Sequence, residues 1–153
     1  MHAVREQLLE QQARALGLPV WKVPLPWPCS NDEYEALMTG VFDRARAEGI
    51  DEIAYGDLFL EDVRAYREAR HAGTGLRATL TCVDPKQLSA SFAGREFDAA
   101  LLDALPPSVD PCGENGEFHT FAHAGPMFAS PVAIVPGEIV ERDGFVFADL
   151  LPG

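Results

Sequence analysis

The densest group of residues able to do chemistry lies between Asp110 and Phe121. Gly113 and Gly116 stand three positions apart, so the backbone can turn sharply there and approach a ligand closely. The same segment offers carboxylates, an amide and a hydroxyl, on Glu114, Asn115, Glu117 and Thr120. We therefore expect either a loop that binds a polar ligand or a solvated turn that leads into a β-strand.

Cys112, His119 and His123 raise two further possibilities at this segment. Alternate residues of a strand share a face, so His119 and His123 would point the same way and could bind zinc together with Cys112. A fourth ligand is not evident, and Cys82 would serve only if the fold brings it near. Cys112 could also be a nucleophile beside His119, but no third group is evident to orient the histidine. A structural or substrate-facing role is favoured over both, and no metal site is predicted.

A second candidate group combines three basic residues in a helix expected at residues 60–72. Arg64, Arg67 and His71 would share one face of that helix and could bind a phosphate or pyrophosphate. Alternatively, they complement the helix dipole at its carboxyl end. Trp21 and Trp27, which flank a proline-rich loop, could form a stacking surface, but core positions beneath the loop are favoured for them.

Helices and strands alternate along the first part of the chain, which predicts an α/β fold. Helical periodicity and stop signals predict helices at 2–16, from Ser30 or Asn31 to Gly49, at 60–72 and near 97–105. Short apolar runs predict strands at 18–25, 50–55 and 77–83. The near-continuous apolar character of 77–83 suits a parallel strand covered on both faces. From about Glu117 onward, alternation and turn residues predict mainly antiparallel strands.

The length of 153 residues and 47% hydrophobic content are typical of a globular protein. The formal net charge of −12 argues against nucleic-acid binding. The three widely spaced cysteines favour a reducing, cytoplasmic setting, and neither a signal peptide nor a membrane-spanning run is evident. We predict two parts, a nucleotide-binding region at 1–105 and a substrate-binding β region at 106–153.

Residues 112–120 read Cys-Gly-Glu-Asn-Gly-Glu-Phe-His-Thr. This segment resembles the Gly-Glu-x-Gly-Glu-aromatic-x-Thr signature of the diphthine–ammonia ligase-like branch of the adenine nucleotide α-hydrolases, within the PP-loop ATP pyrophosphatase superfamily. Two further stretches agree in order with that family. They are Gly56-Asp57 ahead of an acidic and arginine-bearing helix, and Thr81-Cys82-Val83-Asp84-Pro85 ahead of the signature.

The resemblance implies a parallel Rossmann-like sheet of the PP-loop/HUP type and an ATP-dependent, amide-forming ligase. Such an enzyme adenylates a carboxylate, releases pyrophosphate and lets ammonia displace AMP, with ATP and Mg²⁺ as its cofactors. The resemblance implies nucleotide binding by Gly56, Asp57, Arg64 and Arg67. It also implies that the acceptor or amine is held by Cys112, Gly113, Glu114, Asn115, Gly116, Glu117, His119 and Thr120. Individual catalytic residues are not assigned.

The chain departs from the family pattern in its phosphate-binding loop. No Ser-Gly-Gly-Lys-Asp-Ser-like loop occurs in it, and its two lysines, Lys22 and Lys86, stand in other contexts. A further loop and helix of the family pattern are missing between Leu76 and Arg77. Two interpretations follow: a truncated or incomplete ligase, or a non-catalytic binding or assembly module that uses exposed sheet edges to dimerise or to complete a partner.

Overall fold

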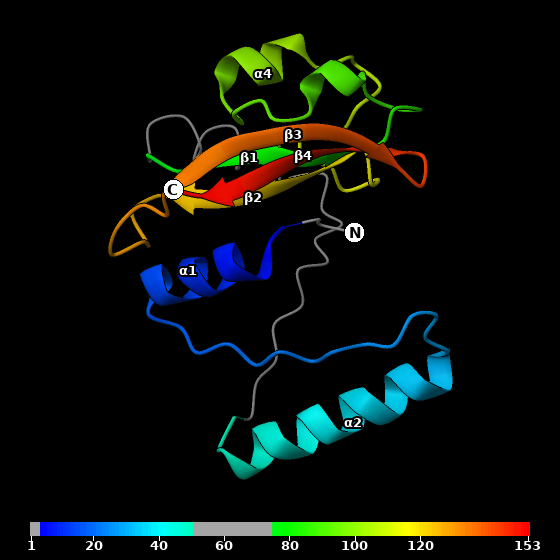
Figure 1. Cartoon of the computed structure of the whole chain (residues 1–153), viewed down its shortest axis with the longest axis vertical. Helices are drawn as coiled ribbons and strands as arrows, with labels where there is room; N and C mark the ends of the chain where they lie inside the picture. Colours follow the sequence, from blue (N-terminus) through cyan, green and yellow to red (C-terminus); the bar gives the residue numbers. More distant parts are fainter. Residues whose placement is uncertain (1–3, 51–74) are drawn as a thin grey trace. The chain divides into compact units, whose positions relative to one another are not determined.

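The computed structural model describes residues 4–50 and 75–153 (Figure 1). These residues belong to two compact units, and each is described by itself. The first unit comprises residues 4–19 and 75–153, and the second comprises residues 20–50. The predicted strand at 50–55 and helix at 60–72 lie outside the described residues, apart from Ile50.

A four-stranded sheet forms the centre of the first unit (Figure 1). Its strands are β1 (Arg77–Val83), β2 (Phe118–Ala124), β3 (Ile134–Arg142) and β4 (Phe145–Pro152). They follow the order β2-β1-β4-β3, and every neighbouring pair is antiparallel. Asp143 and Gly144, both with positive φ, form the tight turn between β3 and β4, as an Asp-Gly pair commonly does in a hairpin.

The predicted parallel, Rossmann-like sheet is wrong, because β1 pairs antiparallel with both of its neighbours. All residues of β1 after Arg77 are buried, so the apolar sequence correctly indicated burial on both faces. It did not fix strand direction, because the faces of an antiparallel strand can be covered equally well. The prediction of antiparallel strands after Glu117 is confirmed, and these strands share one sheet with β1.

Each face of the sheet carries its own apolar core. On one face, the short helix η1 (Ala90–Phe92) and helix α4 (Ala99–Ala104) cover a cluster of Leu80, Val83, Leu88, Phe92, Leu101, Val109 and Phe118. On the other, helix α1 (Glu6–Leu16) contributes to a cluster of Leu8, Phe121, Val132 and Leu150. Figure 1 shows α4 and α1 on opposite sides of the sheet. The predicted short helix near 97–105 is confirmed by α4.

Helix α1 confirms the first predicted helix, and its end is set by Gly17, which adopts the left-handed conformation with φ 69°. Leu8 is completely buried under the sheet. The side-chain amide of Gln12 donates a 2.6 Å hydrogen bond to the Ala122 carbonyl, and the Ala129 amide donates to the Ala15 carbonyl at 2.7 Å. The carboxyl-terminal half of the helix is therefore tied to β2 and to the segment between β2 and β3.

The second unit contains helix α2 (Asn31–Ala47), which confirms the other long helix predicted. Ser30 and Glu33 form a reciprocal capping box at its start, which satisfies amide groups that the helix leaves unpaired. The predicted strand at 18–25 is wrong, since these residues have no regular secondary structure. Its two prolines supply no amide hydrogen for a sheet, which explains the failure of the apolar pattern.

The two tryptophans of the second unit differ in exposure. Trp21 is half-buried, and the Arg44 guanidinium lies 3.9 Å from the centroid of its ring, a favourable cation–π contact. Trp27 is 96% exposed, so the core position predicted for it is wrong. No helix in the described part of the chain is both long and apolar enough to cross a membrane.

Candidate functional site

The glycine-rich segment forms a loop of turns that leads from α4 into β2. It is fixed to the end of β1, because the Asp84 amide donates a 2.9 Å hydrogen bond to the Glu117 carbonyl. Directly beyond it, Val83 of β1 pairs with Phe118 of β2. The loop therefore sits at one end of the β1–β2 pair, on a backbone held by the sheet.

Glu117 organises the interior of this loop. Its side chain is 1% exposed, and its carboxylate accepts three hydrogen bonds from within the loop. One oxygen, Oε1, accepts from the Asp110 amide at 2.9 Å and from Nδ2 of Asn115 at 3.1 Å, while Oε2 accepts from the Asn115 amide at 3.0 Å. A buried carboxylate needs such donors, and here it fixes the loop from inside.

Asp110 performs the same task at the start of the loop. Its Oδ1 accepts from the Cys112 amide at 2.9 Å, and its Oδ2 accepts from the Glu114 amide at 3.2 Å. Asp110 was absent from the residues predicted to form the site. Its position ahead of a proline and two glycines could have indicated this turn-forming role, because aspartate side chains commonly bond to backbone amides two residues on.

The two glycines of the loop are constrained in different ways. Both adopt positive φ, 67° at Gly113 and 80° at Gly116. A Cβ added to Gly113 would lie 2.8 Å from the Phe118 carbonyl oxygen, whereas one at Gly116 would meet nothing within 4 Å. The close approach at Gly113 is therefore to the protein's own backbone, whereas the sequence predicted an approach to a ligand.

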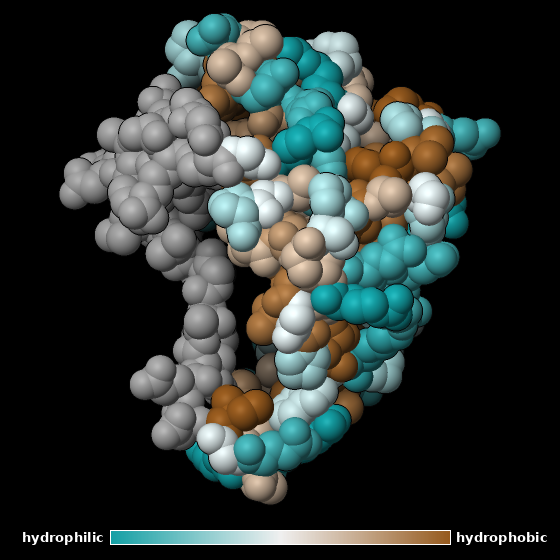
Figure 2. All heavy atoms as spheres, turned by 90° about the vertical axis from the view of Figure 1, so that its left-hand side faces the viewer, coloured by the Kyte–Doolittle hydropathy of each residue, from teal (hydrophilic) through white to brown (hydrophobic). Residues whose placement is uncertain are grey.

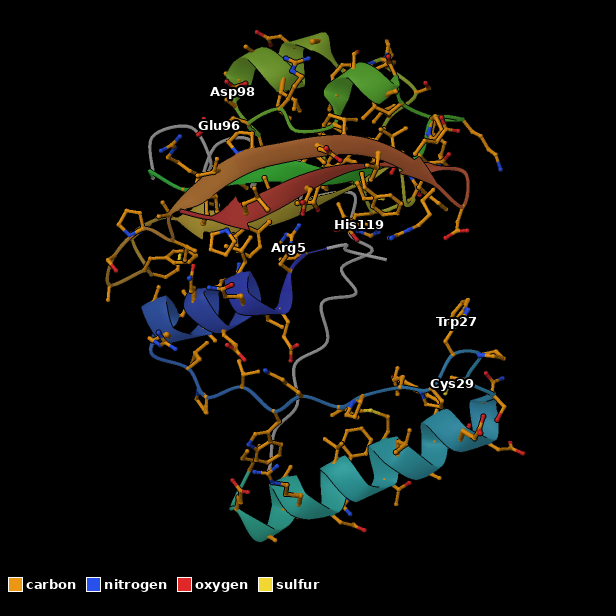
Figure 3. The ribbon with its side chains drawn as sticks, in the orientation of Figure 1. Arg5, Trp27, Cys29, Glu96, Asp98 and His119 are labelled. Atoms are coloured by element: carbon orange, nitrogen blue, oxygen red, sulfur yellow. The ribbon has the colours of Figure 1, made fainter. Side chains whose placement is uncertain are left out.

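The remaining predicted residues differ in exposure and in the side of the sheet that they face. Asn115 and Thr120 are exposed, and Cys112, Glu114 and His119 are half-buried. Figure 3 shows His119 on the side of the sheet that also carries Arg5. Because side chains alternate along a strand, Thr120 faces the other side. The structure therefore brings the predicted residues to one end of β2 without gathering them on one face.

The amino-acid sequence from residue 67 to residue 148 matches the family model described as the diphthamide synthase C-terminal domain. The match covers more than half of the chain and includes the whole loop, β1, β2 and β3. The chain belongs to this family. No curated protein matches it. The relationship to diphthine–ammonia ligases that the loop sequence suggested is thus supported by an alignment extending well beyond the signature.

The relationship to diphthine–ammonia ligases implies ATP and Mg²⁺ as cofactors. Within residues 4–50 and 75–153, no three His, Cys, Asp or Glu side chains are placed to hold a metal ion. This also leaves the zinc alternative without support there. Gly56, Asp57, Arg64 and Arg67, predicted to bind the nucleotide, lie outside the described residues.

Cys82 is a poor candidate for nucleophilic or metal chemistry. Its side chain is 2% exposed, and burial raises the pKa of its thiol above the usual value. A raised pKa lowers the fraction of thiolate, the reactive and metal-binding form. Cys82 is best explained as part of the packing of β1.

Proposed function

We propose that this domain binds the acceptor of a diphthine–ammonia ligase-type reaction, in which a carboxylate is converted to an amide. The supporting observation is the loop of residues 110–117, which has the family's signature sequence and is fixed internally by Asp110 and Glu117. A loop that its own hydrogen bonds already hold in one conformation loses little conformational entropy when it binds a ligand. The acceptor is bound where the loop enters β2.

The residues of the signature divide into those that position the loop and those that contact the acceptor. Glu117 and Gly113 are positioning residues, because the first is buried among its own donors and the second packs on Phe118. The exposed Thr120 can donate to a carboxylate, whereas the Glu114 carboxylate can only accept and therefore suits an amine or ammonium. This division accounts for the mixed chemistry of the signature.

A second candidate function is that of a non-catalytic assembly module. It is favoured by β3, an edge strand of the described sheet, on which Val135, Ile139 and Val140 are 46%, 56% and 41% exposed. Edge strands with apolar side chains can pair with another chain. In a dimer formed in this way, the melting temperature would rise with protein concentration. A melting temperature that is independent of concentration would rule the module out as a dimer.

Isothermal titration calorimetry with a diphthine-bearing peptide tests the acceptor proposal. The control ligands are the same peptide with unmodified histidine and with the amide product. We expect the diphthine peptide to bind and both controls to bind at least about tenfold more weakly, since each lacks the carboxylate and its charge-assisted hydrogen bonds. Equal affinity for all three peptides, or no binding, would refute the proposal.

Two substitutions locate that binding in the loop. Thr120→Val and Glu114→Gln should each lower the affinity for the diphthine peptide by about tenfold, because each removes one good polar contact. Glu138→Gln is the matched control for Glu114→Gln, because it removes the same charge from an exposed position of β3. If Glu138→Gln weakens binding as much as Glu114→Gln does, the effect is one of net charge and the loop is not the site.

A further inference from the structure

β1 and β4 separate at the end of the sheet opposite the loop, and we call this separation the fork. β1 and β4 are paired only at Cys82↔Phe147 and Val83↔Val146. Closer to the start of β1, residues 94–97 take the place of β4. The Gly94 amide donates to the Leu80 carbonyl at 2.8 Å, and the Phe97 amide donates to the Ala78 carbonyl at 2.8 Å. β1 and β4 therefore separate, and a cleft of about 450 Å³ lies beside the fork.

Four polar side chains line this cleft: Arg77, Thr79, Glu96 and His123. Arg77 and Glu96 form a two-point ion pair, with Nε–Oε1 at 2.6 Å and Nη2–Oε2 at 3.1 Å. The Thr79 hydroxyl and Nε2 of His123 lie 3.5 Å apart. The cleft thus presents one cation, one anion and two groups capable of hydrogen bonding, from β1, β2 and the 94–97 segment.

The rest of the cleft wall is apolar. Val132, Ile134 and Leu150 line it, together with prolines at 131 and 136. Val132 and Leu150 also belong to the core beneath α1, which makes that wall rigid. Elsewhere, exposed apolar side chains include Val135, Ile139 and Val140 of β3, and Figure 2 shows both brown hydrophobic and teal hydrophilic residues on the face that it presents. The cleft differs from these exposed residues because it combines an apolar wall with a charged rim.

We propose that this cleft binds a small zwitterion with an apolar side chain, the chemistry of an apolar α-amino acid. The ligand's carboxylate pairs with Arg77, its ammonium pairs with Glu96, and its side chain lies against Val132, Ile134 and Leu150. A cleft of this volume is large enough for a small molecule of that kind. The site needs no metal or nucleotide, and it goes beyond the acceptor binding proposed for the loop.

The charges of the rim explain why a zwitterion is preferred. The Arg77 and Glu96 side chains are 57% and 41% exposed, and ion pairs of such exposure are weak enough to be opened by a ligand. A zwitterion replaces the Arg77–Glu96 ion pair by two new ion pairs, one with each side chain, so neither charge is left without a partner. A simple anion would leave Glu96 without its partner, and a simple cation would leave Arg77 without its own.

The cleft is separate from the acceptor loop. Arg77 pairs with Ala124 at the cleft end of the β1–β2 ladder, whereas Val83 pairs with Phe118 at the loop end. Figure 3 shows Glu96 and His119 toward opposite ends of the sheet. Ligand binding in the cleft can therefore be observed independently of the loop.

Titration of L-leucine into the ¹⁵N-labelled chain, followed by two-dimensional NMR, tests the proposal. We expect saturable shifts of the Thr79, Glu96, His123 and Val132 amides. Leucinamide, which lacks the carboxylate, and 4-methylpentanoate, which lacks the ammonium, should bind at least about tenfold more weakly. Glycine, which lacks the apolar side chain, should also bind weakly. Absence of shifts with leucine, or equal shifts with 4-methylpentanoate, would overturn the proposal.

Substitutions of the rim provide the second measurement. Arg77→Gln and Glu96→Gln should each reduce leucine affinity by at least about tenfold, and both are exposed enough for the fold to be retained, which the spectra report directly. The matched control is Arg44→Gln, which removes the same charge from an exposed ion pair between α2 and Glu48, the residue that follows it. Unchanged leucine affinity in both rim variants, or equal loss in Arg44→Gln, would overturn the assignment of the cleft.

Discussion

Glu117, which the family resemblance implied to hold the acceptor or the amine, also has a structural role in the fold. Its carboxylate is buried and is shared among three donors from Asp110 and Asn115. A carboxylate so enclosed is costly to move, and its role is to hold the backbone that precedes β2. The sequence correctly identified the segment, but residue types and spacing do not reveal which carboxylate is turned inward.

Glu117→Gln should destabilise the first unit by about 2 kcal/mol, because the amide nitrogen faces a donor and leaves it unsatisfied. Urea unfolding followed by circular dichroism gives the change. Glu138→Gln, at an exposed position of β3, is the control and should change stability by less than about 0.5 kcal/mol. Equal stabilities of the two variants would show that the hydrogen bonds of Glu117 do not hold the loop.

Gly113→Ala and Gly116→Ala form a second comparison at the residue scale. Both introduce a Cβ at positive φ, which costs about 1–2 kcal/mol in either case. Only Gly113→Ala also places that Cβ 2.8 Å from the Phe118 carbonyl. Its free energy of unfolding should therefore fall by at least about 1 kcal/mol more than that of Gly116→Ala. Similar losses in thermal or urea unfolding would mean that the loop backbone yields to the added methyl group.

His123 predicts a pH dependence of stability. Burial lowers the pKa of its imidazole below 6.5. The positive charge of Arg77 lowers this pKa further, and the negative charge of Glu96 raises it. Just below pH 6.5 the unfolded chain therefore binds more protons at this residue than the folded chain does. The stability contributed by neutral His123 is complete above its unfolded pKa and is lost as the pH falls through the folded pKa.

His123→Gln removes this contribution and should flatten the decline of stability between about pH 7 and about pH 5. Urea unfolding across that range is the measurement. The lowered pKa values of Asp84, Glu96 and Asp149 act in a separate, more acidic window, because their ordinary values are 3.8, 4.5 and 3.8. An unchanged slope in His123→Gln would contradict the assignment.

At the scale of elements, α1 provides the clearest test of packing. Leu8 is fully buried against the sheet, and its neighbour Leu9 is 43% exposed. Leu8→Ala should cost about 3 kcal/mol, as a large-to-small change in a core does. Leu9→Ala should cost less than about 1 kcal/mol. Equal effects of the two changes on urea unfolding would show that α1 does not pack on Phe121 and Leu150 in solution.

The helices were predictable because their signals are local. The periodicity of α1 and α2, the stop at Gly17 and the Ser30 cap all act within a few residues. Strand direction was not predictable, because every residue of β1 after Arg77 is buried, and such burial is compatible with either strand direction. Its apolar run reports that burial, whereas its partners, β2 and β4, are decided by distant residues.

At the scale of the whole molecule, the sequence located the candidate loop but not the structure around it. The signature in residues 112–120 was identified from residue types, and the family match to residues 67–148 places it in a diphthamide synthase C-terminal domain. The cleft of Arg77, Glu96 and His123 was missed. Its members lie up to 46 positions apart in the sequence, and the pairing of β1 with β2 and with residues 94–97 brings them together.

The most direct test of the central claim is a two-dimensional NMR titration of the ¹⁵N-labelled chain with the diphthine-bearing peptide. Acceptor binding by the loop predicts saturable shifts concentrated in the amides of residues 110–120, with the strongest at Glu114 and Thr120. Shifts confined to other parts of the chain, or no shifts at peptide concentrations that saturate the calorimetric signal, would contradict the claim.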